Sequence, residues 1–357
     1  MLSAKLQVVL CALLFCGART RATDSYHNLH LREHANRLGK LVHGRQPVQL
    51  FRRSGTCSFP NKAGMVAVQK NGQNAGWALA SDVSCSYGSW CPYACEPGYL
   101  MAQWDSGSTS YTYPESQYGG LYCDENGNLQ TPDSSRGYCY EGEGTLDAHN
   151  SASSGVAFCQ TVLPGNEEML IPTQVDAGST QPLAVPGPDY WAGTAAHYYV
   201  NAPGTGVSDA CQWGSSSDAS GNWAPYVVGA NADSSGNTYV KVGWNPEYVD
   251  AFGGTTPGFG LRVTCDDKSQ CDGLPCAIDP SQQSVNQVGG SSVSGAGNAA
   301  YCVVTVKNGA KAAIEVFDSA SSNNKRELQH HHRRHEADGA FRTVGGGTAR
   351  SQTAASV

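Results

Sequence analysis

The chain has 357 residues, of which 40% are hydrophobic and 15% are charged, and its formal net charge at pH 7 is −7. The charge is unevenly distributed, because residues 57–318 carry eight Lys and Arg against 25 Asp and Glu, a formal charge of −17, and the other residues sum to +10. Such an acidic core repels phosphate groups, which excludes nucleic acid as an expected ligand and favours a neutral ligand such as a polysaccharide.

The first 53 residues have the composition of targeting and processing segments. Residues 1–22 combine a basic start, an apolar stretch and small residues at candidate cleavage sites, which predicts a secretory signal peptide. That stretch is too short to cross a bilayer, and no other run of about 18 apolar residues follows, so we expect no membrane span. Residues 23–53 are basic and end in Arg52-Arg53, which predicts a pro-segment removed by proteolysis; an exposed basic linker is the alternative.

Twelve cysteines lie in the predicted core domain, residues 54–318, and their even number behind a secretory leader predicts six disulfides. Zinc is the alternative, but the spacing of Cys85, Cys91 and Cys95 fits no common zinc motif and no His lies near them, so we expect no metal ion. The pairing cannot be derived from the sequence. The cysteines are Cys57, Cys85, Cys91, Cys95, Cys123, Cys139, Cys159, Cys211, Cys265, Cys271, Cys276 and Cys302.

Short β-rich runs separated by Gly, Ser, Asn and Asp fill this domain and predict an all-β sandwich or barrel. We expect a disulfide-rich β-sandwich with long loops and little helix, in which residues 105–120 and 143–154 form loops or short helices. The predicted strands lie within residues 65–69, 156–162, 169–175, 197–200, 226–228, 238–242 and 260–263.

The end of the domain has the most specific local pattern. Residues 302–306 and 312–317 flank Asn308-Gly309, which predicts a β-hairpin with a type I′ turn. Residues 319–357 are rich in Ser, Ala, Gly and charge, which predicts a disordered basic tail. Four His in this tail form either a weak transition-metal site or part of a solvated basic surface, and we favour the second interpretation.

Aromatic residues are concentrated in the same domain. A sugar ring stacks on exposed aromatic side chains because its faces present apolar C–H groups, whereas most Trp side chains of a β-rich protein fill the core. Trp104, Trp213 and Trp223 stand beside turn residues and are the best candidates for exposure.

Histidine is scarce, since residues 57–318 contain only His149 and His197, and no metalloprotease, nucleophile-elbow or phosphate-loop motif occurs. Carboxylates are the remaining catalytic groups, and a pair of them is the usual machinery for glycoside hydrolysis. Most must be solvated surface groups. The candidates in aromatic-rich settings are Asp105, Glu115, Asp124, Glu167, Glu168, Asp209 and Glu247.

Several motifs occur in a fixed order along the domain, among them Cys91-Pro-Tyr-Ala-Cys95-Glu-Pro-Gly98, Leu163-Pro-Gly-Asn-Glu167 and Asp209-Ala-Cys-Gln-Trp-Gly214. These segments resemble the SUN family of fungal cell-wall proteins, and the resemblance covers most of residues 57–317. It implies a secreted, β-glucosidase-like protein of glycoside hydrolase family 132. It further implies action on β-1,3-glucan during septation, wall remodelling and polysaccharide degradation.

We therefore predict an extracellular glycosidase in which Glu167 and Asp209, acidic residues of these motifs, are catalytic. Trp104, Asp105, Trp213, Asn222 and Trp223 are predicted to contact the sugar. The expected partner is cell-wall β-glucan, with no cofactor and a monomeric chain. The alternative is a non-catalytic glucan-binding or structural wall protein, by analogy with thaumatin-like sandwiches that bind β-glucan. A secreted effector acting on a host is a third interpretation, which secretion alone supports.

Overall fold

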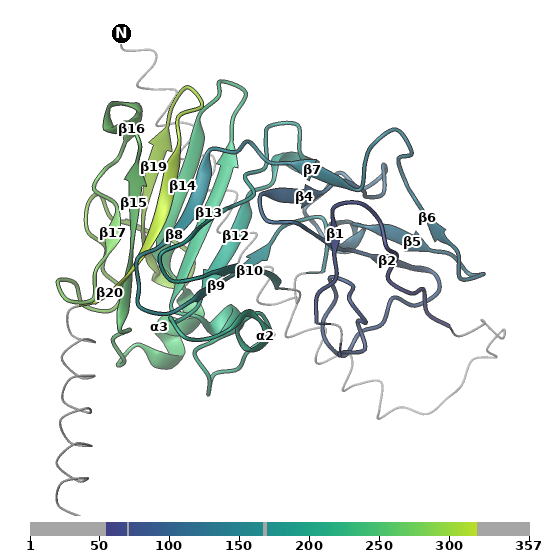
Figure 1. Ribbon diagram of the computed structural model, residues 1–357, viewed down its shortest axis with the longest axis horizontal. Coiled ribbons are helices and arrows are strands. Elements are labelled where there is room, and N and C mark those ends of the chain that lie inside the picture. The colour runs from purple at the N-terminus through teal and green to yellow at the C-terminus, as the bar shows by residue number, and fades with distance from the viewer. Residues whose placement is uncertain (1–54, 70, 167–169, 320–357) are drawn as a thin grey trace, which may run out of the picture.

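The computed structural model describes residues 55–69, 71–166 and 170–319 (Figure 1). The predicted signal peptide, the pro-segment and the tail beyond Ser319 lie outside the described residues. Ser319 itself is buried, and its N–H donates to the carbonyl oxygen of Gly258 at 3.0 Å.

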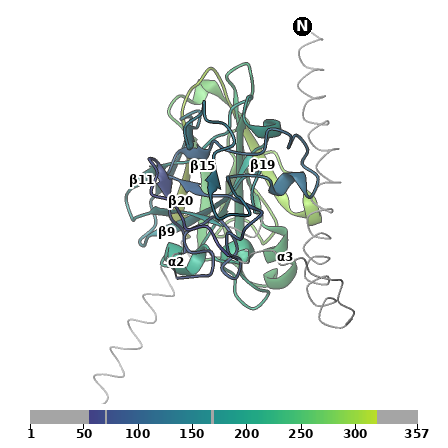
Figure 2. The ribbon, with the colours of Figure 1, turned by 90° about the vertical axis from the view of Figure 1, so that its right-hand side faces the viewer.

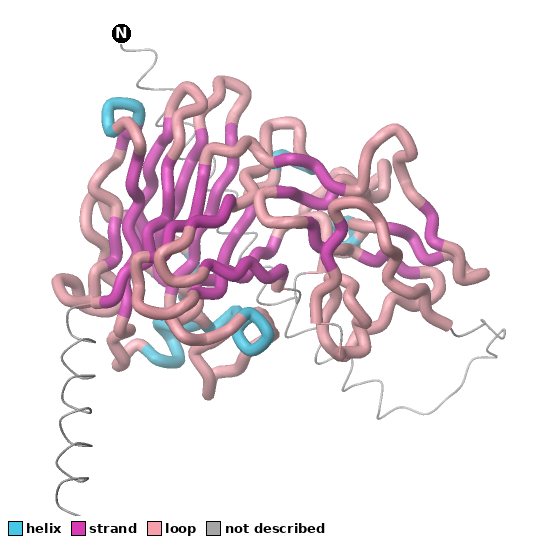
Figure 3. The backbone as a smooth tube through the Cα atoms, in the orientation of Figure 1, coloured by secondary structure: helices cyan, strands magenta, loops and turns pink. Residues whose placement is uncertain are grey.

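Two lobes lie side by side in Figure 1: an N-terminal lobe, residues 55–142, and a sandwich lobe, residues 143–319. Long strands dominate the sandwich lobe, whereas loops dominate the N-terminal lobe (Figure 3). The sandwich lobe contains an eight-stranded and a five-stranded sheet. The first sheet comprises β9 (Val156–Thr161), β10 (Ile171–Val175), β12 (Ala196–Val200), β13 (Tyr226–Ala232), β14 (Thr238–Trp244), β16 (Cys271–Asp272), β18 (Val293–Ser294) and β19 (Ala300–Val306). The second comprises β8 (Leu146–Asn150), β11 (Thr180–Pro182), β15 (Phe259–Cys265), β17 (Ala277–Ile278) and β20 (Ala312–Asp318).

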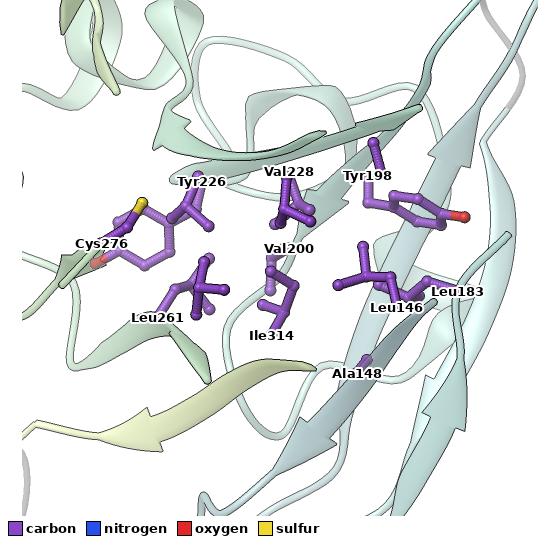
Figure 4. Packing of buried hydrophobic residues seen from close by; sticks show 14 of the residues in the cluster. Leu146, Ala148, Leu183, Tyr198, Val200, Tyr226, Val228, Leu261, Cys276 and Ile314 are labelled. Carbon is purple, nitrogen blue, oxygen red and sulfur yellow. The ribbon is translucent and has the colours of Figure 1, made fainter. Parts of the chain in front are cut away.

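The main hydrophobic core lies between these two sheets. Strands β8, β12 and β19 alternate between fully buried and more accessible side chains, as expected when a strand turns one face to a core. Figure 4 shows Tyr198 and Val228 of the eight-stranded sheet facing Leu146 and Ile314 of the five-stranded sheet. The predicted all-β sandwich is therefore confirmed.

The N-terminal lobe has a smaller core in which disulfides pack against Trp77 and Tyr93. Its strands are two or three residues long, too short to bury a large apolar face, so covalent bridges supply much of its constraint. They are β1 (Met65–Val66), β2 (Ser89–Cys91), β3 (Ala94–Cys95), β4 (Tyr99–Met101), β5 (Leu121–Cys123), β6 (Leu129–Gln130) and β7 (Cys139–Glu141).

All twelve cysteines of residues 57–302 are paired, so the six predicted disulfides are confirmed. Three bridges lie within each lobe. They join Cys57 to Cys123, Cys85 to Cys91, Cys95 to Cys139, Cys159 to Cys211, Cys265 to Cys271 and Cys276 to Cys302. The sulfurs of Cys57, Cys85 and Cys123 lie within 4.8 Å of one another, but each already belongs to a bridge.

Among residues 55–319, apart from the four that are not described, helices are few and short, as predicted. Two α-helices, α2 and α3, lie at one end of the sandwich (Figure 2). In the part of the chain that is described, no helix combines the length and apolarity needed to cross a membrane. The helices are η1 (Glu115–Gln117), η2 (Trp191–Gly193), α2 (Val207–Ala210), η3 (Gly221–Trp223), α3 (Pro246–Phe252), η4 (Lys268–Gln270) and η5 (Ala296–Asn298).

Each of the seven runs predicted as β-rich contains a strand, but the prediction for residues 143–154 is wrong in part. That segment contains β8, which pairs with β20 in parallel. Its buried residues, Leu146, Ala148 and Asn150, occupy every second position. The strand has only two apolar side chains, Leu146 and Ala148, and ends in the polar Asn150, so its sequence is a weak signal for a β-strand. Its parallel partner lies more than 160 residues away.

The predicted terminal hairpin is also wrong in its pairing. Asn308 and Gly309 adopt positive φ values of 55° and 67°, as expected for the turn. However, β19 pairs with β14, β16 and β18, whereas β20 pairs with β15 and β8 in the other sheet. The N–H of Gly309 donates to the carbonyl oxygen of Gly236 at 3.0 Å. Both strands bury an apolar face, and placing them in opposite sheets lets both faces share one core.

Arg262 of β15 and Glu315 of β20 are paired across neighbouring inner strands of the five-stranded sheet and form an ion pair. The guanidinium donates two hydrogen bonds, at 2.8 and 2.6 Å, to the carboxylate. These bonds, with a further bond from Ser151, hold the pKa of Glu315 below its usual value despite partial burial. Because the folded pKa is lowered, the stabilisation is present above the unfolded pKa and is lost as pH falls through the folded pKa.

We expect Arg262→Ala to lower the free energy of unfolding by about 0.5–1 kcal/mol at neutral pH, since Arg262 is half exposed and its charge is screened. The gap from wild type should close as pH falls through the pKa of Glu315, which urea unfolding at a series of pH values would measure. Glu125→Gln, on an exposed turn, is the control and should show no such gap. A gap that stays constant with pH contradicts the assignment.

Candidate functional site

Five aromatic rings form a continuous cluster where the two lobes meet, which we call the aromatic platform: Trp104, Tyr111, Tyr140, Tyr190 and Trp191. Tyr190 and Trp191 are buried. The ring centroid of Tyr190 lies 5.4 Å from that of Trp104 and 6.1 Å from that of Tyr140, and Trp191 lies 5.4 Å from Tyr111. Tyr111 and Tyr140 are each 40% exposed and Trp104 is half-buried, so three rings present surface to solvent.

Hydrogen bonds between the lobes fix this platform. The hydroxyl of Tyr190 donates to the carbonyl oxygen of Met101 at 2.9 Å, and the indole N–H of Trp191 donates to Ser108 at 2.7 Å. In the same place the hydroxyl of Tyr111 donates to Ala192 at 2.9 Å. Each of these bonds satisfies an aromatic polar group as its ring is buried or packed, which holds the rings in fixed positions.

Two contacts position Trp104, one to its backbone and one to its ring. Its backbone forms an antiparallel bridge with Gly119, and the guanidinium of Arg136 lies 4.9 Å from its ring centroid. Arg136 is placed by the loop 133–137, which the fully buried side chain of Gln103 binds. The amide of Gln103 donates to the carbonyl oxygens of Asp133, Arg136 and Gly137 and accepts from the N–H of Asp133.

We expect Gln103→Leu to cost about 2–4 kcal/mol of unfolding free energy, because it leaves buried backbone groups without partners. It should also release Arg136 from Trp104 and change the tryptophan fluorescence of the folded protein. Urea unfolding followed by fluorescence measures both effects. Gln282→Leu, at an exposed position with a single side-chain hydrogen bond to Asp279, is the control. Equal losses in the two variants would contradict this role for Gln103.

Two of the predicted carboxylates beside the platform are bound to their own loop. Asp105, predicted to contact sugar, accepts from the N–H of Gly107 at 2.9 Å. Glu115 accepts from the N–H groups of Thr109 and Ser110, each at 3.1 Å. Both residues therefore shape the loop that carries Tyr111.

Asp124 and Glu247 lie in other parts of the fold. Asp124 accepts from the N–H groups of Asn126 and Asn128, each at 2.8 Å, and these bonds are the main reason that its pKa is lowered. Glu247 lies in the first turn of α3, where Asn245 caps the helix. We assign Asp124 a structural role in its turn.

Two carboxylates that sequence analysis did not single out lie close to Tyr140. Burial, followed by the charges of Glu143 and Asp189, raises the pKa of the Tyr140 hydroxyl. Both carboxylates are exposed, and among the described residues neither makes a side-chain hydrogen bond or an ion pair. The adjacent aromatic pair Tyr190-Trp191 is the feature of the sequence that could have indicated this region. Glu143 is three positions from Tyr140 in the chain, but Asp189 and Tyr190 are about 50 positions away, and a sequence pattern cannot show that contact.

The other predicted residues form a second group near α2. Asp209 is exposed in the first turn of α2, and Trp213 is 39% exposed in the loop that follows. Asn222 is buried and accepts from the N–H of Gly214 at 2.7 Å, and Trp223 is half-buried in η3. Asn222 therefore shapes the loop that carries both Trp side chains.

Buried asparagines complete the support of this loop. Asn201 accepts from the N–H of Gly221 at 2.9 Å, and Asn245 donates to the carbonyl oxygens of Asn222 and Ala224. The loop also joins the lobes, since Gln69 donates to the carbonyl oxygen of Cys211 at 2.7 Å.

The predicted sugar-binding residues thus fall into two groups. Figure 1 shows α2 at the lower end of the sandwich, whereas β4 and β7, which carry the platform on the N-terminal lobe, lie higher. Trp104 and Asp105 belong to the platform; Asp209, Trp213, Asn222 and Trp223 belong to the α2 group. Glu167 and Glu168 lie outside the described residues.

Comparison with known families places residues 52–304 within one model, described as beta-glucosidase (SUN family). The uncharacterized protein YMR244W of Saccharomyces cerevisiae is 63% identical over 288 residues, which cover 78% of this chain and 81% of the relative. The probable secreted beta-glucosidase adg3 of Schizosaccharomyces pombe is 49% identical over 309 residues, covering 84% of this chain and 27% of the relative. The probable secreted beta-glucosidase UTH1 of Saccharomyces cerevisiae is 39% identical over 231 residues, covering 61% of each chain.

The chain therefore spans about a quarter of adg3 and about three-fifths of UTH1. Among solved structures, the thaumatin-like xylanase inhibitor TLXI matches with a TM-score of 0.26 and 12% identity, covering 49% of this chain and 98% of the inhibitor. Two of these relatives are named as secreted, and six disulfides are typical of an oxidising compartment. The predicted extracellular location is confirmed.

Proposed function

The chain belongs to the SUN family, as its motifs predict, and from this premise we propose that it is a secreted cell-wall glycosidase acting on β-1,3-glucan. In this proposal it serves wall remodelling, septation and polysaccharide degradation. The observation that carries the proposal is the aromatic platform, whose exposed rings offer a place for a sugar chain to stack.

Three properties of the platform suit a neutral polysaccharide. Tyr111 and Tyr140 are exposed and Trp104 is half-buried, and all three rings pack on buried rings, so little side-chain entropy is lost when a ligand binds. A pyranose face is apolar and stacks on such rings. The acidic core does not repel an uncharged glucan, in contrast to a phosphate or an anionic polymer.

Hydrolysis of a glycosidic bond requires one carboxyl group to protonate the leaving oxygen and a second to attack carbon or to activate water. Glu167 and Asp209 remain our candidates from the sequence motifs. Asp209 is exposed and available to a substrate. Leu170 packs with Ala210 and Cys211, the two residues that follow Asp209 in the chain.

A second candidate function is glucan binding without turnover. It is favoured by the bonds of Asp105 and Glu115 to their own loop, since these two carboxylates of the platform are committed to structure. A binding protein needs the stacked rings and no catalytic pair. Cell-wall attachment would then be the role of the platform.

The decisive experiment incubates purified full-chain protein with laminari-oligosaccharides and measures affinity and product lengths. We expect Trp104→Ala to weaken binding by about tenfold or more, because it removes a stacking ring. Trp213→Ala is the comparison, since Trp213 is the more exposed of the two Trp side chains but lies in the α2 group. If Trp104→Ala binds glucan as wild type does and Trp213→Ala binds it more weakly, the glucan binds at the α2 group and not at the platform.

The chemistry is tested with Glu167→Gln and Asp209→Asn in the same assay. If either residue is catalytic, we expect turnover to fall by about 100-fold or more while glucan affinity is retained. If both variants retain wild-type turnover, Glu167 and Asp209 are not the catalytic pair. Tight binding by wild type without any product favours the non-catalytic function.

A further inference from the structure

The polar end of the aromatic platform is built around Gly187. A Cβ atom placed on Gly187 would collide with Oε1 of Glu143 and would lie 3.4 Å from the hydroxyl oxygen of Tyr140. The carboxylate and the hydroxyl therefore converge over a glycine, where the absence of a side chain leaves room for both. Tyr140 is in turn the exposed ring that contacts Tyr190.

The backbone on both sides of this contact is fixed. The N–H of Glu143 donates to the carbonyl oxygen of Val185 at 3.0 Å, and the N–H of Gly142 donates to Gly98 at 3.0 Å. A turn bond from the N–H of Tyr190 to the carbonyl oxygen of Gly187, at 3.2 Å, holds the other segment. The two oxygens are thus presented by ordered chain, even though the Glu143 side chain itself is exposed.

We propose that Tyr140 and Glu143 form a sugar subsite at this end of the platform, in which one glucose unit of a β-glucan stacks on Tyr140 while its hydroxyl groups hydrogen-bond to Glu143 and to the Tyr140 hydroxyl. The inference rests on the proposed function, because it takes a neutral glucan as the ligand. It assigns residues that the sequence motifs do not single out.

The chemistry of the two groups fits this ligand. A carboxylate accepts charge-assisted hydrogen bonds, and the hydroxyl groups of a sugar are donors. The Glu143 carboxylate has no protein donor among the described residues, so it is available to accept from a ligand. A carboxylate placed beside an aromatic stacking surface is a usual arrangement in ligand sites, where the ring supplies the contact area and a few polar groups orient the ligand.

Arg136 makes the two ends of the platform chemically different. Its guanidinium lies over the half-buried ring of Trp104, 4.9 Å from the ring centroid, and its Nε pairs with the Asp133 carboxylate at 3.0 Å, so the other N–H donors of the guanidinium stand at this ring. Hydrogen-bond acceptors stand at the other end, beside Tyr140. A glucan chain running across Trp104 and Tyr140 therefore meets donors at one end and acceptors at the other, and its hydroxyl groups can pair with both.

The experiment measures the affinity of full-chain protein for laminari-oligosaccharides by calorimetry in wild type and three variants. Glu143→Gln and Tyr140→Phe should each weaken binding about 5- to 20-fold, the loss expected for one hydrogen bond to a ligand. Gly187→Ala keeps both chemical groups but displaces the carboxylate, and we expect a loss of the same size. The colliding atom is the end of a flexible side chain, so the fold should be retained.

Matched controls are Gly254→Ala, where a Cβ meets no atom within 4 Å, and Glu125→Gln on an exposed turn. Both should bind as wild type does, and all variants should unfold at the wild-type temperature. If Glu143→Gln and Gly187→Ala bind normally while Trp104→Ala does not, the subsite is wrong and the proposed function stands. If wild type binds no glucan, the proposed function and the subsite are both wrong.

Discussion

The burial of Tyr190 and Trp191 between the lobes is the interaction on which the rest of the structure depends. Their rings belong to the sandwich lobe, but their polar atoms are satisfied by the backbone of Met101 and Ser108 in the N-terminal lobe. A buried hydroxyl or indole N–H without such a partner would cost about 1–3 kcal/mol, so the two lobes must meet in one relative position. The same two rings support Trp104, Tyr111 and Tyr140. Joining the lobes and building the platform are therefore one event.

An acidic composition does not by itself provide functional carboxylates. Two turns repeat the pattern Asp-x-x-Gly-Asn, at residues 124–128 and 233–237. In each, one carboxylate oxygen accepts from two backbone N–H groups of its own turn. These aspartates replace the regular hydrogen bonds that a tight connection lacks. Part of the negative charge of the described residues is thus a consequence of a fold with many short connections. Carboxylates without such bonds, Glu143 and Asp189 among them, are those with capacity for a ligand.

Local patterns in the sequence predicted what local physics determines. Short β-rich runs bounded by Gly, Ser, Asn and Asp located strands, and Asn308-Gly309 located a turn with two positive φ values. The same patterns could not assign β19 and β20 to different sheets, because either partner would bury the same apolar face. They also could not bring Gly187 to Glu143 and Tyr140, since this contact joins segments that are far apart in the sequence. Trp104, Trp213 and Trp223 were correctly selected for partial exposure from neighbouring turn residues. The separation of Trp104 from the other two, however, arises from topology.

The division of the six disulfides, three within each lobe, has a consequence for assembly. Covalent bonds constrain each lobe, whereas the described contacts between the lobes are hydrogen bonds, ring contacts and apolar packing, all of which form and break reversibly. Oxidation can thus be complete in both lobes before they dock. The platform, with rings from both lobes, exists only in the docked arrangement. Ligand binding to the platform therefore depends on the docking of the two lobes. A ligand that contacts rings of both lobes would bind only the docked arrangement and would stabilise the junction by mass action.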